Sequence, residues 1–220
     1  MVADAAEFLQ ERVPAHVQRR KLAKDVAVFP FMITACAGRV PAQSDVSEPV
    51  QKTEEPEKTE GPEKKEIYDI SVSDLTFLRD GKKIYGKLYA PEGEGRYPAV
   101  ILGHPFGADL SVMECYAEAF AKNGIIAYAF DFIGGGQNIQ SDGTMEEMSV
   151  LTEAADMNTV FDGIRSLDTV DDENMYVMGA SQGGFVATYV AATRPQDVRG
   201  LIALYPAYVL QDDARARTNN

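Results

Sequence analysis

The sequence predicts an α/β fold: a mostly parallel sheet with helices on both faces and an antiparallel hairpin at its N-terminal edge. Alternating apolar residues from 70 to 90 surround the pair Asp80-Gly81, which is typical of a β-hairpin. Four short apolar runs follow, each long enough for a strand buried on both faces. Helical patterns separate them, and this alternation favours a parallel sheet with right-handed crossovers. The runs are residues 99–102, 125–130, 175–178 and 201–204.

Three helices are expected from apolar residues spaced by three and four. The first two are each expected to begin at a capping box, a Ser or Thr followed three residues later by Glu. Cys115 flanks the apolar face of the first helix and is expected to be buried there. The expected helices cover residues 111–124, 144–164 and 182–195, with capping pairs Ser111–Glu114 and Thr144–Glu147.

The first 66 residues differ in composition from the rest. A basic cluster precedes an apolar stretch of about ten residues that ends in "ITAC", as in a signal peptide, and the stretch is too short to span a bilayer. The stretch also resembles a bacterial lipobox, which implies a lipid on Cys36; a short apolar helix packed on the domain is the alternative. Residues 37–66 are rich in Pro, Glu and Lys and are interpreted as a flexible linker. The predicted organisation is therefore a signal or lipoprotein segment at 1–36, a linker at 37–66 and the folded α/β domain at 67–220.

Composition argues against several classes of partner. The formal net charge of -13 is unfavourable for nucleic acid, which is bound through clustered Lys and Arg. Two cysteines and two histidines, His16 and His104, are too few and too scattered for a zinc site. The glycine run at 134–136 lacks the spacing of a phosphate-binding loop and is expected to form a tight turn. No metal and no cofactor is implied.

The stretch "GASQGG" at 179–184 carries the clearest chemical signal. It places Ser181 between glycines after an apolar run and before a helical pattern, which is the strand-turn-helix context of G-x-S-x-G. Gly179 and Gly183 permit the sharp turn that exposes the serine hydroxyl at the carboxyl edge of the sheet. The backbone amide of Gln182, next to the serine, is a candidate donor to an oxyanion. The stretch thus predicts Ser181 as a nucleophile.

The segment from Tyr68 to about Ala214 resembles the α/β-hydrolase fold. Within that fold it is similar to the bacterial cinnamoyl and feruloyl esterase-like group and to serine-aminopeptidase-like relatives. The stretches that carry the resemblance are "LGHPFGAD", "DFIGGGQNIQSDG" and "GASQGG". The resemblance implies that the amide of Phe106 is the second oxyanion donor. Pro105 stands where the group usually has glycine; proline removes its own N-H and fixes φ, so the loop geometry departs from the family pattern.

The remainder of a catalytic triad is missing after Ser181. In this fold the chain order is Ser, then Asp or Glu, then His, yet no histidine follows Ser181. His104 is expected to serve the hydrogen bonding of its own loop rather than act as the base. Asp212 or Asp213 could supply the acid, although a solvated loop carboxylate is the commoner case. Two explanations stay open: a C-terminally truncated esterase that lacks its last strands, or a noncatalytic binding module.

The sequence thus indicates a serine hydrolase of small carboxylic esters, working through an acyl-enzyme on Ser181 and weakly active or inactive without the triad Asp and His. An acyl-peptidase or aminopeptidase-like hydrolase is the alternative within the enzyme class. The expected partner is a small-molecule ester, with membrane contact only through a lipid on Cys36. That lipid would make the protein an extracytoplasmic, membrane-anchored bacterial lipoprotein.

Overall fold

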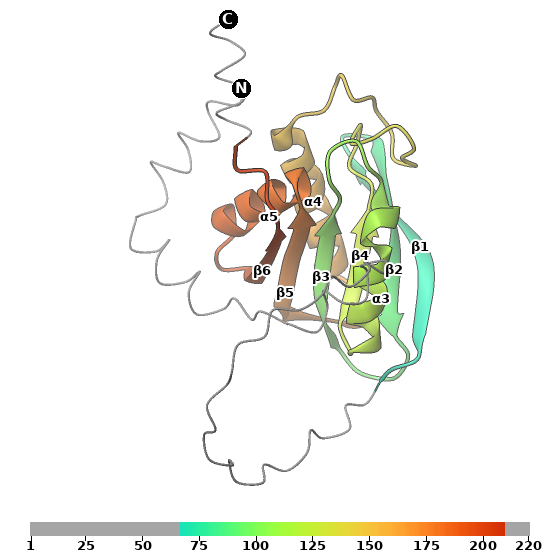
Figure 1. The fold of residues 1–220 in the computed structure, drawn as a ribbon. Coiled ribbons are helices and arrows are strands. Elements are labelled where there is room, and N and C mark those ends of the chain that lie inside the picture. Colours follow the sequence, from blue (N-terminus) through green and yellow to red (C-terminus); the bar gives the residue numbers. More distant parts are fainter. Residues whose placement is uncertain (1–66, 210–220) are drawn as a thin grey trace, which may run out of the picture.

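The computed structural model describes residues 67–209 and shows a six-stranded sheet with helices on both faces (Figure 1). The strand order is β1-β2-β4-β3-β5-β6, which confirms the predicted α/β fold. The signal segment 1–36 and the linker 37–66 lie outside the described residues, and both stay predictions. The elements are β1 Ile70–Arg79, β2 Lys82–Pro91, β3 Tyr97–Gly103, the 3-10 helix η1 Leu110–Met113, α3 Glu114–Lys122, β4 Ile126–Phe130, α4 Val150–Arg165, β5 Val170–Ala180, α5 Gln182–Thr193 and β6 Val198–Leu204.

The sheet combines an antiparallel edge with a parallel centre. β1 and β2 form the expected hairpin around Asp80 and Gly81, both of which have positive φ, and β2 pairs antiparallel with β4. The remaining neighbours, β4 with β3, β3 with β5 and β5 with β6, are parallel. The carboxyl ends of these four strands therefore lie at one edge of the sheet, where the loops of α/β proteins bind ligands.

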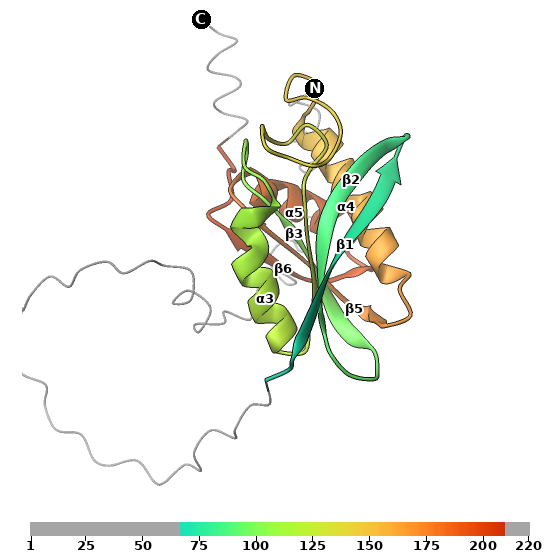
Figure 2. The ribbon, with the colours of Figure 1, turned by 90° about the vertical axis from the view of Figure 1, so that its right-hand side faces the viewer.

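Two apolar clusters hold the helices to the two faces of the sheet. Alternate residues of each central strand point to opposite faces, so Val100 and Leu102 pack with α3 while Ile101 packs with α4 and α5. Figure 2 shows α3 and α4 on opposite sides of the sheet. Because both faces of β3 and β4 are covered, these strands are apolar along nearly their whole length.

The predicted helix starts are wrong in detail. Asp109 caps η1 by accepting a hydrogen bond from the Ser111 amide, so the Ser111–Glu114 capping box does not form. α4 begins at Val150, six residues later than predicted, behind a capping box of Ser149 with Thr152. Cys115 is exposed rather than buried. Local signatures repeat along a chain, and tertiary packing decides which of them starts a helix.

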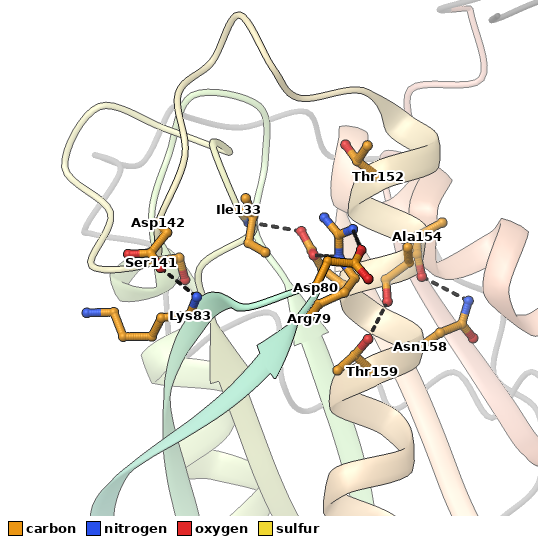
Figure 3. Close-up of polar contacts among 12 residues, drawn as sticks. Arg79, Asp80, Lys83, Ile133, Ser141, Asp142, Thr152, Ala154, Asn158 and Thr159 are labelled. Carbon is orange, nitrogen blue, oxygen red and sulfur yellow. Dashed lines mark hydrogen bonds and ion pairs between the residues drawn. The ribbon is translucent and has the colours of Figure 1, made fainter.

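The hairpin is fastened to α4 by a buried ion pair. Arg79 Nε donates to Asp156 Oδ1 at 2.5 Å, and the other oxygen of Asp156 accepts from the Ile133 amide at 2.9 Å (Figure 3). Asp142 accepts from the Lys83 amide, which ties the loop after β4 to the same hairpin (Figure 3). Burial raises the pKa of Asp156 from 3.8 to about 6, against the lowering effect of Arg79. The hairpin, α4 and this loop therefore form one connected unit.

Replacing Arg79 with methionine is expected to destabilise the protein by about 3–5 kcal/mol, since it leaves a buried carboxylate without its cation. The loss is expected to be larger at pH 8 than at pH 5, because a protonated Asp156 needs no cation and its pKa will rise further in the variant. Denaturant unfolding at the two pH values measures this. Lys82→Met, which breaks the exposed pair with Glu147, is the control and should cost about 1 kcal/mol or less. If Arg79→Met and Lys82→Met lose the same unfolding free energy, the buried pair of Arg79 with Asp156 does not stabilise the fold as proposed.

β6 forms the other edge of the described sheet. Most of its residues are only half-buried, whereas the central strands β3 and β4 are almost fully buried. Within residues 67–209 no strand pairs with the outer edge of β6. No helix in this range is long and apolar enough to cross a membrane.

Candidate functional site

Ser181 occupies the turn between β5 and α5, at the edge where the carboxyl ends of the parallel strands meet. Its φ of 52° and ψ of -117° lie in a region that residues other than glycine rarely adopt. Backbone hydrogen bonds hold this conformation: its amide donates to Leu204 O, and its carbonyl accepts from the amides of Phe185 and Ala207. The side chain of Ser181 is partly exposed. A strained serine is thus presented to solvent at the N-terminus of α5.

The glycines around Ser181 are required by close backbone contact. A Cβ on Gly179 would lie well under 3.0 Å from the backbone of Gly183, and a Cβ on Gly183 would clash in the same way with Gly103 O and His104 O. The first turn of α5 therefore packs directly on the loop that follows β3. This contact brings the two segments that the sequence predicts for the site, 103–107 and 179–183, together.

His104 organises the loop after β3. Its Nδ1 donates to Pro105 O at 2.8 Å, and its Nε2 accepts from the Phe132 amide at 3.2 Å. Both ring nitrogens are engaged with backbone, and burial lowers the pKa of the ring, so a neutral imidazole with the proton on Nδ1 fits both bonds. His104 therefore lacks a free nitrogen to accept a proton from Ser181, as the sequence indicated.

The loop is closed by backbone bonds and tolerates Pro105. Pro105 O also accepts from the Ala108 amide, and the Gly107 amide donates to Gly135 O, beside an isolated parallel bridge between Gly107 and Gly136. The predicted turn after β4 is present, with Gly134 at a positive φ of 69°. The loops after β3 and β4 therefore brace each other.

Asp131, which follows β4 directly, joins the same two loops. It accepts from the Leu110 amide at 2.7 Å and from the Gln140 amide at 2.7 Å, while its backbone carbonyl accepts from the Ser141 hydroxyl. Burial raises the pKa of this carboxyl group, and the two backbone amides oppose that effect. Asp131 is thus a structural residue at the site edge that sequence reasoning did not single out.

The two residues with candidate oxyanion amides lie on the two segments that pack together here, the first turn of α5 and the loop after β3. Gln182 is the first residue of α5 and is buried, whereas Phe106 sits in the loop after β3 with 58% of its surface exposed. Donors for an oxyanion need to be fixed before the charge develops. The bonds of His104 and Gly107 fix the loop that carries Phe106, and the packing of Gly183 fixes the turn that carries Gln182.

A buried carboxylic acid, Glu153, lies beneath the turn. It belongs to the first turn of α4, is 1% exposed, and accepts a hydrogen bond from Gln182 Nε2 at 2.8 Å. Burial raises its pKa from 4.5 to about 8; the bond from Gln182 opposes this shift, and nearby Asp156 adds to it. Glu153 could not be singled out from the sequence, because a glutamate inside a helix is usually solvated.

Glu153→Gln is expected to stabilise the protein, and more so as pH rises. Because the folded-state pKa is raised, the native protein holds this proton more tightly than the unfolded chain, and stability falls from pH 4.5 towards pH 8. A glutamine does not titrate, so it removes a penalty of up to about 5 kcal/mol at pH 8.5 and almost nothing at pH 4.5. Thermal unfolding of both proteins across this range measures the difference. If the difference in stability between Glu153→Gln and the wild type does not increase with pH, the pKa of Glu153 is not raised.

The other predicted site residues lie outside the described range. Cys36, the predicted lipid anchor, and Asp212 or Asp213, the candidate acids, are not among residues 67–209. Within that range His104 is the one histidine, so the described part of the chain brings no base to Ser181. The structure thus assembles the serine turn and the neighbouring loop and leaves the remainder of a triad unassigned.

Comparison with known proteins identifies the family. The profile of Hydrolase_4, described as Serine aminopeptidase, S33, matches residues 78–219. The chain belongs to this family. A curated relative from Escherichia coli, an uncharacterized 31.7 kDa protein in the traX-finO intergenic region, is 30% identical over 110 residues, covering 50% of this chain and 36% of that protein. The family match and the sheet topology confirm the α/β-hydrolase fold.

Several solved hydrolases share the fold. Est1E from Butyrivibrio proteoclasticus, solved with ferulic acid bound, is 28% identical with a TM-score of 0.59, over 64% of this chain and 56% of that one. An acetyl xylan esterase from Paenibacillus sp. R4 has a TM-score of 0.56 at 20% identity, over 72% and 55%, a likeness of fold alone. The chain therefore spans about half the length of these structures and about a third of the curated relative.

Proposed function

We propose that this protein is a serine hydrolase that cleaves small carboxylic esters through an acyl-enzyme on Ser181. The observation that carries the proposal is the strained turn at Ser181, at positive φ between a parallel strand and a helix N-terminus. Backbone strain of this kind persists where surrounding structure holds it, and it is frequent at catalytic residues. Family membership and the likeness to Est1E, solved with ferulic acid bound, support hydrolysis of an ester.

The proposed reaction begins when Ser181 Oγ attacks the ester carbonyl carbon. The hydroxyl proton passes to a general base, and the carbonyl oxygen becomes an oxyanion that the amides of Gln182 and Phe106 stabilise. Collapse of this intermediate breaks the ester C–O bond; the alcohol takes the proton and leaves the acyl group on Ser181. Water, activated by the same base, then attacks the acyl-enzyme and releases the acid and the free serine.

The base and its carboxylate partner are proposed to come from sequence that continues the fold after β6. The half-buried β6 edge and the short span relative to known structures support this. Translation of the gene beyond codon 220 tests it: an Asp followed by a His, in segments with strand and helix patterns, is expected. A stop codon directly after codon 220, with no such sequence in any frame, would favour a noncatalytic binding module.

Ester and amide substrates separate the proposed activity from the aminopeptidase-like alternative. We expect the full-length protein to turn over p-nitrophenyl acetate or butyrate with a kcat/KM at least about a hundredfold above that for an aminoacyl p-nitroanilide, a difference of roughly 3 kcal/mol in transition-state binding. A preference for the anilide would replace the esterase proposal with the peptidase one. Failure to hydrolyse either substrate, with saturable ligand binding that survives Ser181→Ala, would support a binding module.

An extracytoplasmic location through a lipid on Cys36 is proposed from the "ITAC" stretch alone. Mass spectrometry of the mature protein tests it. An N-terminus at a diacylated Cys36 is expected, and an unprocessed chain starting at Met1 would overturn the proposal.

A further inference from the structure

α4 and α5 begin at the edge of the sheet that carries Ser181, and a buried hydrogen bond joins their first turns. Gln182 Nε2 donates to Glu153 Oε2 at 2.8 Å. Glu153 is 1% exposed and Gln182 is 7% exposed, so water does not compete for either group. The bond connects two residues that are 29 positions apart in the chain, and one of them, Gln182, directly follows the proposed nucleophile.

We propose that Glu153 is a positioning residue for the oxyanion hole: its carboxyl group holds the side chain of Gln182 and so fixes the direction of the Gln182 backbone amide. The inference rests on the proposed function, because it requires that amide to bind the developing oxyanion.

The peptide between Ser181 and Gln182 is held from both ends. On one side, the carbonyl of Ser181 accepts from the amides of Phe185 and Ala207 at 3.1 and 3.0 Å. The peptide is planar and trans, so the N–H of Gln182 points away from those two donors. On the other side, the bond to Glu153 restrains the Gln182 side chain and through it the Cα. Ser181 makes no side-chain capping bond to α5, which leaves this turn dependent on such anchors.

A neutral carboxyl group suits this position. Burial raises the pKa of Glu153 to about 8, so at neutral pH it accepts the bond without placing a negative charge beside the oxyanion. Asp156, one turn along α4, acts on Glu153 electrostatically and is itself paired with Arg79 of β1. α5 presents no acidic side chain in its first turn. Glutamine at position 153 would reproduce the accepting oxygen and the neutrality.

Steady-state hydrolysis of p-nitrophenyl butyrate by the full-length protein tests this. Glu153→Met is expected to lower kcat at least about tenfold with KM changed by less than about twofold, since a misdirected oxyanion donor weakens the transition state alone. Glu153→Gln is expected to keep kcat within about threefold of the wild type. Val160→Ala, a core truncation two turns along α4, is the control: it should lower the unfolding temperature and leave kcat unchanged.

If Glu153→Met does not fold, Gln182→Met and the double variant of Glu153 and Gln182 test the same bond. Gln182→Met retains the backbone amide but loses the donor to Glu153, so it is expected to show the same loss of kcat. The variant that carries both changes should show no larger a loss of kcat than either single variant, because the two groups act through one bond.

The outcomes separate this inference from the proposed function. Unchanged kcat in both Glu153→Met and Gln182→Met, or an equal loss in Glu153→Gln, would overturn the positioning role while Ser181-dependent hydrolysis stands. Hydrolysis that is undiminished in Ser181→Ala would overturn the proposed function, and the positioning role with it.

Discussion

Ser181→Ala and Ser181→Gly are both expected to abolish ester hydrolysis, but only Ser181→Gly is expected to change stability. Loss of the nucleophile should lower kcat by at least about a thousandfold, since mutation of a catalytic serine removes nearly the whole contribution of the triad. Alanine keeps the steric strain at φ 52°, so its unfolding temperature should match the wild type. Glycine relieves that strain and is expected to stabilise the protein by about 1 kcal/mol.

Calorimetry and hydrolysis assays on the same three proteins check this prediction. If Ser181→Gly is no more stable than Ser181→Ala, the turn is not strained as the structure indicates. If either variant retains wild-type kcat, another residue carries the reaction and the assignment of Ser181 fails.

Gly183→Ala is expected to disrupt the site and to destabilise the domain strongly. The added methyl group would lie within 3.0 Å of the carbonyl oxygens of Gly103 and His104, which belong to the backbone of a buried strand end and cannot move cheaply. Overpacking typically costs 1–3 kcal/mol, and a clash with fixed backbone is expected to reach at least about 3 kcal/mol. The displaced turn also moves the Gln182 amide, so activity should fall further than stability alone explains.

Gly81→Ala is a matched control for this substitution. Gly81 has a positive φ of 78°, but a Cβ there meets no atom within 4 Å, so only backbone strain is added. Chemical denaturation should show a loss of about 1–2 kcal/mol for Gly81→Ala and unchanged kcat. A Gly183→Ala protein as stable as the Gly81→Ala control would show that α5 does not pack against the loop after β3.

Features that depend on neighbouring residues were predictable from the sequence. The turn at Asp80-Gly81 follows from the positive φ that both positions adopt, and the Ser181 turn follows from glycines that leave room for backbone contact. The β5–Ser181–α5 order is likewise local, because an apolar run, a glycine turn and a helical pattern are adjacent in the chain.

Features that depend on distant partners were not predictable. Thr144 and Glu147 have the same spacing as a capping box, yet α4 begins at Val150, where Ser149 and Thr152 cap each other. Glu153 is a buried acid because Gln182 reaches it from another helix, and Asp156 is buried because Arg79 reaches it across 77 residues. A single helix pattern carries no record of such contacts, so the burial of these two acids could not be predicted from it.

Covalent labelling of Ser181 tests the central claim most directly. The full-length protein would be treated with a fluorophosphonate, digested, and mapped by mass spectrometry, with Ser181→Ala and an excess of p-nitrophenyl butyrate as controls. We expect one stoichiometric adduct on Ser181, which forms more slowly in the presence of the ester and is absent from Ser181→Ala. No adduct on a folded protein, or an adduct on another residue that persists in Ser181→Ala, would contradict it.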